Sequence, residues 1–123
     1  MAKFYICKNC GNIIEMVKDK CPAITCCGEK VSELVPGTSD GAKEKHVPVY
    51  KVDGNKVTVN VGEAEHPMTE AHLIEWIAVE TDKGLYRRNL TAEDKPAAEF
   101  LLAADEKVVE VYAYCNLHGL YKA

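Results

Sequence analysis

Hydrophobic and polar residues alternate along much of the second half of the chain, which is the pattern of half-buried β-strands. The stretch VPVYKVDGNKVTVNV at residues 47–61 holds two valine-rich runs around an Asp-Gly pair. An Asp-Gly pair between two such runs is a strong signal for a β-hairpin. In the second run Val57, Val59 and Val61 alternate with polar residues, so we expect one apolar face.

Four more stretches have the composition of strands. LIEWIAVET at residues 73–81 and KVVEVYAY at 107–114 are rich in β-branched and aromatic residues, which favour strands. GLYRRNL at 84–90 and AAEFLLA at 97–103 are weaker candidates, and the second could also form a short helix on propensity alone. Several short strands joined by turns predict a β-sandwich or a β-barrel.

A linker divides the chain. LVPGTSDGAKEK at residues 34–45 is rich in Pro, Gly, Ser and Asp, a composition that is typical of linkers. We therefore expect a short first domain, residues 1–36, and a larger second domain, residues 37–123. The first is too short to be held together by hydrophobic burial alone, so a metal is expected to stabilise it.

Composition limits the class of protein. The chain has 123 residues, of which 47% are hydrophobic, and no apolar run approaches the ~20 residues that cross a membrane. The start, MAKFYICKNCG, lacks the pattern of a secretory signal, so we expect a cytoplasmic protein with no membrane contact. The net charge of −4 argues against binding to nucleic acid.

Five of the six cysteines lie in the first 27 residues: CKNCGN supplies Cys7 and Cys10, and CPAITCCGEK supplies Cys21, Cys26 and Cys27. Thiols stay reduced in the cytoplasm, so such a cluster indicates a metal site more than a set of disulfides. A C-x2-C pair and a second pair would complete a tetrahedral four-thiolate site, which suits zinc or iron. Five thiols compete for four places, and spacing alone does not choose among them. The adjacent Cys26 and Cys27 must splay apart, which predicts a distorted site.

The sixth cysteine and the four histidines lie near the ends of the predicted strands: His46, His66, His72, Cys115 and His118. Taken singly, each histidine is more often an ordinary surface or hydrogen-bonded residue, and Cys115 could be a small core residue. Together they could gather at one end of a sandwich, where loops cluster.

The number of these donors indicates a metal. Five ligands exceed the four of structural zinc and the three of most catalytic zinc sites. Four nitrogens and one sulfur leave an octahedral metal one open position. Iron is favoured, because imidazole suits it and a thiolate donates electron density to it. The pattern therefore predicts a non-haem iron that reacts with a small oxygen species.

The segments EKHVPV, EHPMTEAHLIEWI and YCNLHG resemble those of superoxide reductases. With the N-terminal CKNC and CCG, the chain resembles desulfoferrodoxin, the two-iron form of that family. The resemblance implies a mainly β fold: a small desulforedoxin-like, metal-stapled domain at residues 1–36, followed by an immunoglobulin-like seven-stranded β-sandwich, the catalytic domain, at 37–123. It also implies two irons, one held by His46, His66, His72, His118 and Cys115, and one held by Cys7, Cys10, Cys26 and Cys27.

The resemblance further implies the reaction, the reduction of superoxide to hydrogen peroxide with an electron from Fe(II). Cys115 would be the axial thiolate, trans to the open position where superoxide binds. Glu44 would occupy that position in the oxidised iron, and Lys45 would attract superoxide. A rubredoxin-like donor would restore Fe(II), and such proteins are usually homodimers.

One residue departs from the family pattern, which has no cysteine at the position of Cys21. Cys21 is a further thiol that could displace one of the four N-terminal ligands, and zinc is an alternative to iron at that site. We expect that site to be structural or dimer-forming rather than an obligatory relay. An electron-transfer or structural metal protein without turnover stays open as an alternative function, as does a protein with zinc in both sites.

Overall fold

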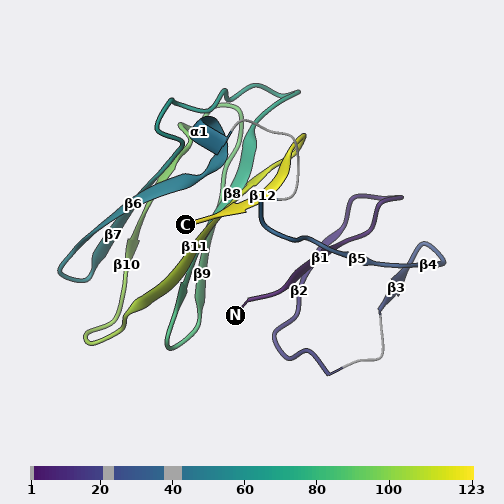
Figure 1. The fold of residues 1–123 in the computed structure, drawn as a ribbon, viewed down its shortest axis with the longest axis horizontal. Coiled ribbons are helices and arrows are strands. Elements are labelled where there is room, and N and C mark those ends of the chain that lie inside the picture. Colours follow the sequence, from purple (N-terminus) through teal and green to yellow (C-terminus); the bar gives the residue numbers. More distant parts are fainter. Residues whose placement is uncertain (1, 21–23, 38–42) are drawn as a thin grey trace. The chain divides into compact units, whose positions relative to one another are not determined.

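The computed structural model describes residues 2–20, 24–37 and 43–123, without the side chains of residues 43 and 44. The chain divides into two compact units, Met1–Val35 and Pro36–Ala123 (Figure 1). Both are built almost entirely of antiparallel β-strands.

The first unit contains a three-stranded sheet and a separate hairpin. In the sheet β1 (Phe4–Ile6) lies between β2 (Ile13–Glu15) and β5 (Ser32–Glu33), and β3 (Thr25–Cys26) pairs with β4 (Glu29–Lys30).

The apolar core of this unit is very small. Among its described hydrophobic side chains, three are buried: Phe4, Cys7 and Val31. So little burial does not stabilise a domain of this length without a further crosslink, and the cysteines are placed to supply one.

The second unit is a sandwich of two antiparallel sheets, and its described residues form seven strands, as the resemblance implied. One sheet has the order β10-β7-β6 and the other the order β12-β11-β8-β9. The strands are β6 (Pro48–Asp53), β7 (Lys56–Val61), β8 (Ile74–Thr81), β9 (Leu85–Asn89), β10 (Ala97–Leu101), β11 (Val108–Cys115) and β12 (Gly119–Lys122).

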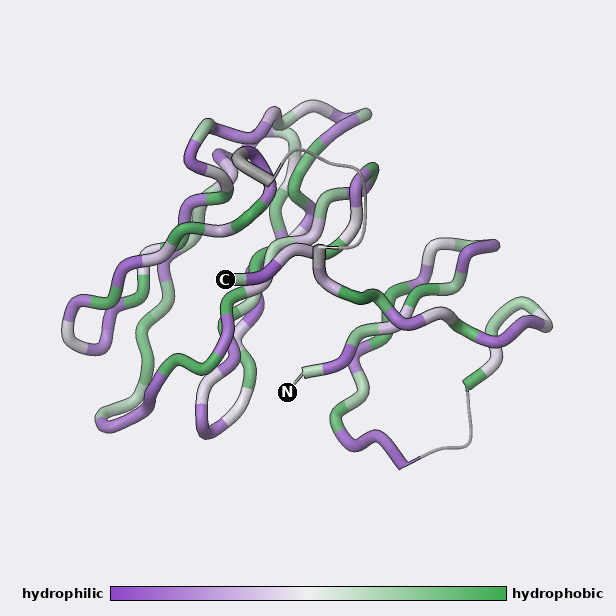
Figure 2. Tube along the Cα trace, viewed as in Figure 1, coloured by the Kyte–Doolittle hydropathy of each residue, from purple (hydrophilic) through white to green (hydrophobic). Residues whose placement is uncertain are grey.

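The core between the sheets follows the alternation in the sequence. Val57, Val59 and Val61 are almost fully buried, and the hairpin between β6 and β7 is confirmed. The stretch Ala97–Leu101, for which a short helix was the alternative, is a strand paired with β7. Figure 2 shows hydrophobic residues along the strands and hydrophilic residues at the tips of the β6–β7 and β8–β9 hairpins.

A single helical turn, α1 (Lys43–His46), precedes β6. Part of the stretch expected to be a linker is therefore helical, and four residues are too few to give a periodic signal in the sequence. In Figure 1, α1 lies at the same end of the sandwich as the β7–β8 loop and the β11–β12 turn. Within the described ranges, no helix has the length and apolarity needed to cross a membrane.

Candidate metal centres

Three segments bring histidine and cysteine side chains to one end of the sandwich. His46 is the last residue of α1, and His66 and His72 lie in the loop between β7 and β8. Cys115 ends β11, and His118 precedes β12. The structure brings together all five residues that the sequence analysis selected as ligands of a catalytic metal.

Their donor atoms converge on one point. The Nε2 atom of His46 lies 3.0 Å from Nε2 of His66 and 3.0 Å from Nδ1 of His118. The Sγ atom of Cys115 lies 3.8 Å from the same Nδ1 atom. One donor atom from each of His46, His66, His72 and Cys115 falls within 4.8 Å of the others.

The protonation of His66 indicates that this cluster suits a cation. Its Nδ1 atom lies 2.7 Å from the carbonyl oxygen of Pro67, and a carbonyl only accepts, so Nδ1 carries the proton. Burial lowers the pKa of His66 to about 4, so its ring is neutral at pH 7 and Nε2 presents a lone pair. That lone pair faces Nε2 of His46, which also faces His118. One N–H on His46 cannot satisfy both neighbours, whereas a metal ion would accept every lone pair.

His72 gives a second indication. Its Nε2 atom is buried and has no hydrogen-bond partner among the described residues, although a buried polar atom normally has one. The pKa of His72 is lowered by burial, by His118 and by the positive charge of Lys45. A neutral imidazole with an unused nitrogen, whose ring lies near three other imidazoles, is suited to ligate a metal.

Cys115 belongs both to the core and to this cluster. It is fully buried and packs with the apolar residues between the sheets, so the interpretation as a core residue is also correct. Burial raises the pKa of its thiol, while the backbone N–H groups of Leu117 and His118 lower it. A bound cation would favour the thiolate further.

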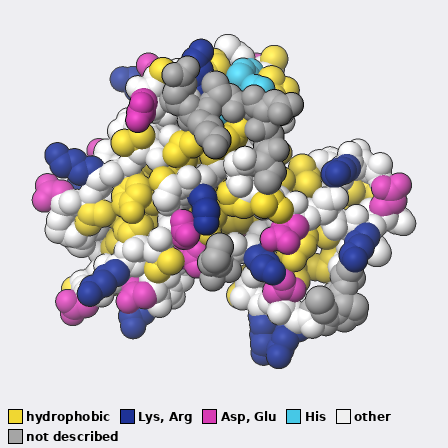
Figure 3. Space-filling model, in the orientation of Figure 1, with side chains coloured by type: hydrophobic (Ala, Val, Ile, Leu, Met, Phe, Trp, Pro, Cys, Tyr) yellow, Lys and Arg dark blue, Asp and Glu magenta, His cyan; other side chains and the backbone are white. Residues whose placement is uncertain are grey.

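Two charged residues, Glu44 and Lys45, directly precede His46 in the sequence. Lys45 is exposed on α1, and its charge acts on His72. The side chain of Glu44 lies outside the described part of the structure. In Figure 3, histidine is visible on the surface at this end of the sandwich, with hydrophobic side chains beside it and Lys or Arg side chains close by.

The sequence analysis missed residues that position these ligands. Gly62 packs against the backbone of α1, Tyr121 stacks on the ring of His46 with 4.8 Å between centroids, and Asn116 bridges two ligand-bearing segments. Asn116 lies within YCNLHG, but a sequence does not indicate which distant backbone its side chain would reach.

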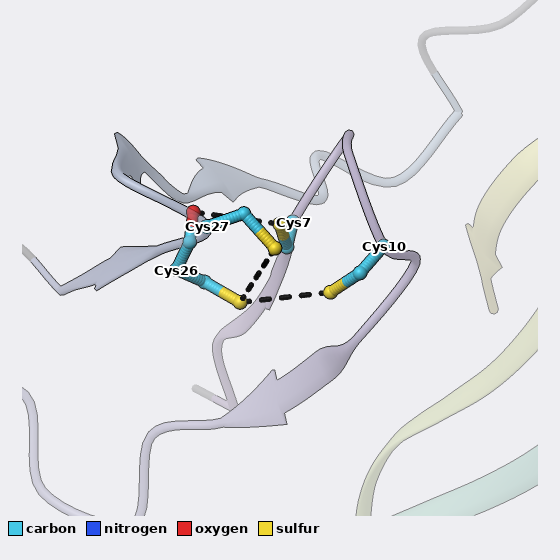
Figure 4. A group of neighbouring side chains, drawn as sticks. All are labelled: Cys7, Cys10, Cys26 and Cys27. Carbon is cyan, nitrogen blue, oxygen red and sulfur yellow. Dashed lines mark hydrogen bonds between the residues drawn. The ribbon is translucent and has the colours of Figure 1, made fainter.

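The second cluster consists of four cysteines in the first unit (Figure 4). The Sγ atom of Cys26 lies 3.6 Å from that of Cys10 and 4.0 Å from that of Cys27, and the Sγ atom of Cys7 lies 3.6 Å from the carbonyl oxygen of Cys26. The four sulfurs fall within 4.8 Å of one another. Cys21 lies outside the described residues.

The backbone explains how two adjacent cysteines reach one site. Cys26 ends β3, and Cys27 and Gly28 form the two-residue turn to β4, with φ values of 54° and 76°. Positive φ at both central residues is the pattern of a type I′ hairpin turn. The left-handed conformation of Cys27 costs about 1 kcal/mol of stability. It turns the Cys27 sulfur to the same side as that of Cys26.

The ionisation of these thiols also favours a cation. A hydrogen bond from the backbone N–H of Cys10 lowers the pKa of Cys7 to about 7. Contacts with the thiols of Cys10, Cys7 and Cys26 raise the pKa of Cys27 to about 12. Four thiolates this close repel one another, so a metal ion is needed to hold all four in the ionised form.

Comparisons with known proteins agree with this geometry. The family model described as Desulfoferrodoxin matches residues 38–123. A desulfoferrodoxin of Nitratidesulfovibrio vulgaris is 46% identical over 98% of this chain and 94% of its own length. A desulfoferrodoxin homolog of Archaeoglobus fulgidus is 45% identical over 97% and 94%. The crystal structure of the superoxide reductase from Treponema pallidum superposes with a TM-score of 0.84 at 36% identity, covering 100% of this chain and 98% of that one.

Proposed function

The chain belongs to the desulfoferrodoxin family, and on that premise we propose that it is a superoxide reductase. It reduces superoxide with one electron and two protons to hydrogen peroxide. The observation that carries the proposal is the convergence of four imidazole nitrogens and one buried thiol at one end of the sandwich.

The ligands of the catalytic iron in this proposal are His46, His66 and His72 through Nε2, His118 through Nδ1, and Cys115 through its sulfur. The geometry that supports it is the direction of these atoms and the unpartnered nitrogen of His72. Iron held by these residues would supply the electron that superoxide accepts, and an external donor would restore it.

The protein's own groups prepare the site for this chemistry. The carbonyl of Pro67 fixes the proton of His66 on Nδ1 and so keeps Nε2 available. Burial raises the pKa of the Cys115 thiol and keeps solvent from the sulfur, and the amides of Leu117 and His118 partly offset that rise. Lys45 adds a positive charge next to the cluster, which attracts an anionic substrate.

Glu44 completes the proposed site on the strength of its position in the sequence EKH. Its carboxylate would serve as a further ligand of the oxidised iron. In Glu44→Ala, we expect the ferric absorption band to shift while capture of superoxide by the reduced protein is nearly unchanged. A ferric band identical to that of the wild type across pH would remove Glu44 from the ligand set.

The N-terminal unit, residues 1–36 in the proposed division, holds a second iron through Cys7, Cys10, Cys26 and Cys27, with zinc as the alternative metal. The catalytic domain spans residues 37–123. Electrons come from a rubredoxin-like donor, and the protein acts as a cytoplasmic homodimer that removes superoxide.

The stoichiometry of peroxide formation tests the activity. Iron-loaded protein with excess reductant is exposed to a known amount of superoxide, and both hydrogen peroxide and dioxygen are measured. A reductase yields one peroxide for each superoxide and no dioxygen. One peroxide for every two superoxides, with dioxygen, would identify a dismutase, and no acceleration of superoxide loss would leave a metal protein without turnover. Cys115→Ser is the matched inactive control, because an alcohol is a poorer donor than a thiolate.

A further inference from the structure

The side chain of Asn116 joins the two segments that carry His72 on one side and Cys115 and His118 on the other. Its Oδ1 atom accepts a hydrogen bond from the backbone N–H of Leu73 at 3.0 Å. Its Nδ2 group donates to the carbonyl oxygen of Ala71 at 3.1 Å. The backbone N–H of Asn116 also donates to the carbonyl of Leu73, at 3.2 Å.

These contacts enclose His72, because Ala71 and Leu73 are its two neighbours in the chain. The one side chain of Asn116 therefore holds the backbone immediately before and immediately after the histidine. Asn116 itself lies directly after Cys115 and two residues before His118. The three hydrogen bonds thus tie the positions of three donors to one another.

His72 has a second hydrogen-bonded partner, but that partner is local. The Oγ1 atom of Thr69 accepts from the N–H of His72 at 3.1 Å and donates to its carbonyl at 3.2 Å. This turn shapes the β7–β8 loop from within. It does not fix the loop relative to the β11–β12 turn, because Thr69 and His72 belong to the same loop.

The ring of His72 is not held by hydrogen bonds to the other ligands. Its Nε2 atom has no hydrogen-bond partner among the described residues, and its ring centroid lies 4.7 Å from that of His66 and 5.1 Å from that of His118. The backbone on either side of His72 therefore has to set the direction of that nitrogen.

The two hydrogen bonds need one acceptor and one donor on the same side chain, which the amide of asparagine supplies. An aspartate would still accept from Leu73, but it would place an oxygen against the carbonyl of Ala71, which has no proton to donate. An alanine would lose both bonds.

We propose that Asn116 is a positioning residue of the metal site, which orients His72 relative to Cys115 and His118 so that the five donor atoms converge. It acts through Ala71 and Leu73 and is not itself a ligand. The inference rests on the five-donor metal site of the proposed function but not on turnover, so readouts of the bound metal test it separately from the superoxide assay.

The test compares Asn116→Ala and Asn116→Asp with Asn55→Ala in the iron-loaded, full-length protein. Asn55 is a matched control, because its Nδ2 group also donates to a distant backbone carbonyl, that of Leu102 at 3.1 Å. Asn55 lies in the β6–β7 turn, at the end of β6, whereas α1 with His46 precedes the start of that strand. Asn55 is therefore distant from the ligands along β6. All three variants are expected to lose some stability toward thermal unfolding.

The properties of the bound metal should distinguish the Asn116 variants from Asn55→Ala. Loss of groups that orient metal ligands typically lowers metal affinity by about 10-fold to 100-fold, so Asn116→Ala should release its catalytic iron to a chelator at least about tenfold faster than the wild type. The reduction potential of that iron should shift, and the spectrum of a Co(II)-substituted sample should change as a nitrogen donor is lost. Asn55→Ala should retain the wild-type release rate, potential and Co(II) spectrum. Asn116→Asp, which keeps the bond from Leu73, should fall between.

The proposal is overturned if Asn116→Ala loses stability but has the potential, Co(II) spectrum and iron-release rate of Asn55→Ala. If Asn116→Ala does not fold, Asn116→Asp carries the same comparison with the same two outcomes. Wild-type protein that binds iron tightly but does not reduce superoxide would contradict the proposed activity and leave the role of Asn116 to be decided by these metal readouts.

Discussion

Gly62 lies so close to the backbone of Lys45 that a side chain on it would collide with the helical turn that carries His46. A Cβ atom at Gly62 would fall 2.6 Å from the carbonyl oxygen of Lys45 and 2.5 Å from that of Ala64. The N–H of Gly62 donates to the carbonyl of Val47 at 3.0 Å, and its φ of 86° is one that glycine adopts most easily. Residue 62 therefore determines how close α1 comes to the end of β7.

Replacing Gly62 with alanine should consequently disturb His46 as well as the fold. We expect a loss of about 1–3 kcal/mol from backbone strain and, in addition, weaker binding of the catalytic iron. Gly54→Ala is the matched control, because Gly54 has a φ of 63° but no atom within 4 Å of the added Cβ. It should lose stability without losing iron.

Thermal unfolding and iron content after dialysis against a chelator measure the two effects. Equal iron retention in Gly62→Ala and Gly54→Ala would contradict the idea that this contact positions α1.

The acid stability of the metal-free protein should reflect His66. Its pKa is lowered by burial from 6.5 to about 4 in the folded state, so the unfolded chain binds this proton more readily between those values. Stability therefore rises with pH over this window, is fully present above about pH 6.5 and is lost as the pH falls toward 4. The contribution is at most about 3 kcal/mol.

Denaturant unfolding of metal-free protein at several pH values measures the slope, with His66→Gln as the comparison. If the two proteins have the same pH dependence between 4 and 6.5, the slope does not come from His66.

The sequence was sufficient for most strands because their apolar positions alternate. It was insufficient where pairing with a neighbouring strand determines which side chains are buried. Val109 is two residues before the buried Val111 and would lie on the same face of a regular strand, yet it is 51% exposed. A register shift lies between Val108 and Glu110 in the pairing of β11 with β8, and such irregularities are not visible in local composition.

The site shows the same division between local and tertiary information. Residue chemistry marked the donors, because imidazoles and thiols have few other uses in such a pattern. The residues that bring the donors together, Gly62 and Asn116, act on backbone far away in the sequence. An asparagine or glycine is also common in ordinary turns, so neither could be distinguished before the loops were placed.

The two metal clusters should be separable by mutation. Cys10→Ser removes one of four thiols from the N-terminal cluster and should abolish or weaken its metal, because the Cys10 sulfur lies beside that of Cys26. We expect superoxide reduction by the C-terminal site to remain largely intact, since its five donors all come from the second unit.

Iron content, visible spectra and the superoxide assay on the same sample measure this separation. A Cys10→Ser protein that stays folded, keeps its catalytic iron and loses most activity would instead assign an electron-relay role to the N-terminal metal.

This acidic protein has to capture an anionic substrate. From residue 37 onward the chain has ten Lys and Arg residues and fifteen Asp and Glu residues, so this part carries about −5, and its overall field repels superoxide. A local positive charge can still raise the rate of encounter by about 10-fold or more. Lys45 is placed to supply it, because it is exposed and its charge acts on His72.

Lys45→Ala should therefore slow the second-order reaction of the reduced protein with superoxide by about tenfold. The dependence of that rate on salt should also become flatter, because salt screens exposed charges over ~10 Å at 0.1 M. Lys51→Ala is the matched control, since it removes the same charge from an exposed position on β6. Its effect should be small.

Pulse-generated superoxide at several ionic strengths measures both rates. If Lys45→Ala has the rate and salt slope of Lys51→Ala, the effect of Lys45 is only that of net charge, and the attraction has to come from the metal centre itself. If only Lys45→Ala is slow, and its deficit shrinks as salt is added, the positive charge acts locally at the mouth of the site.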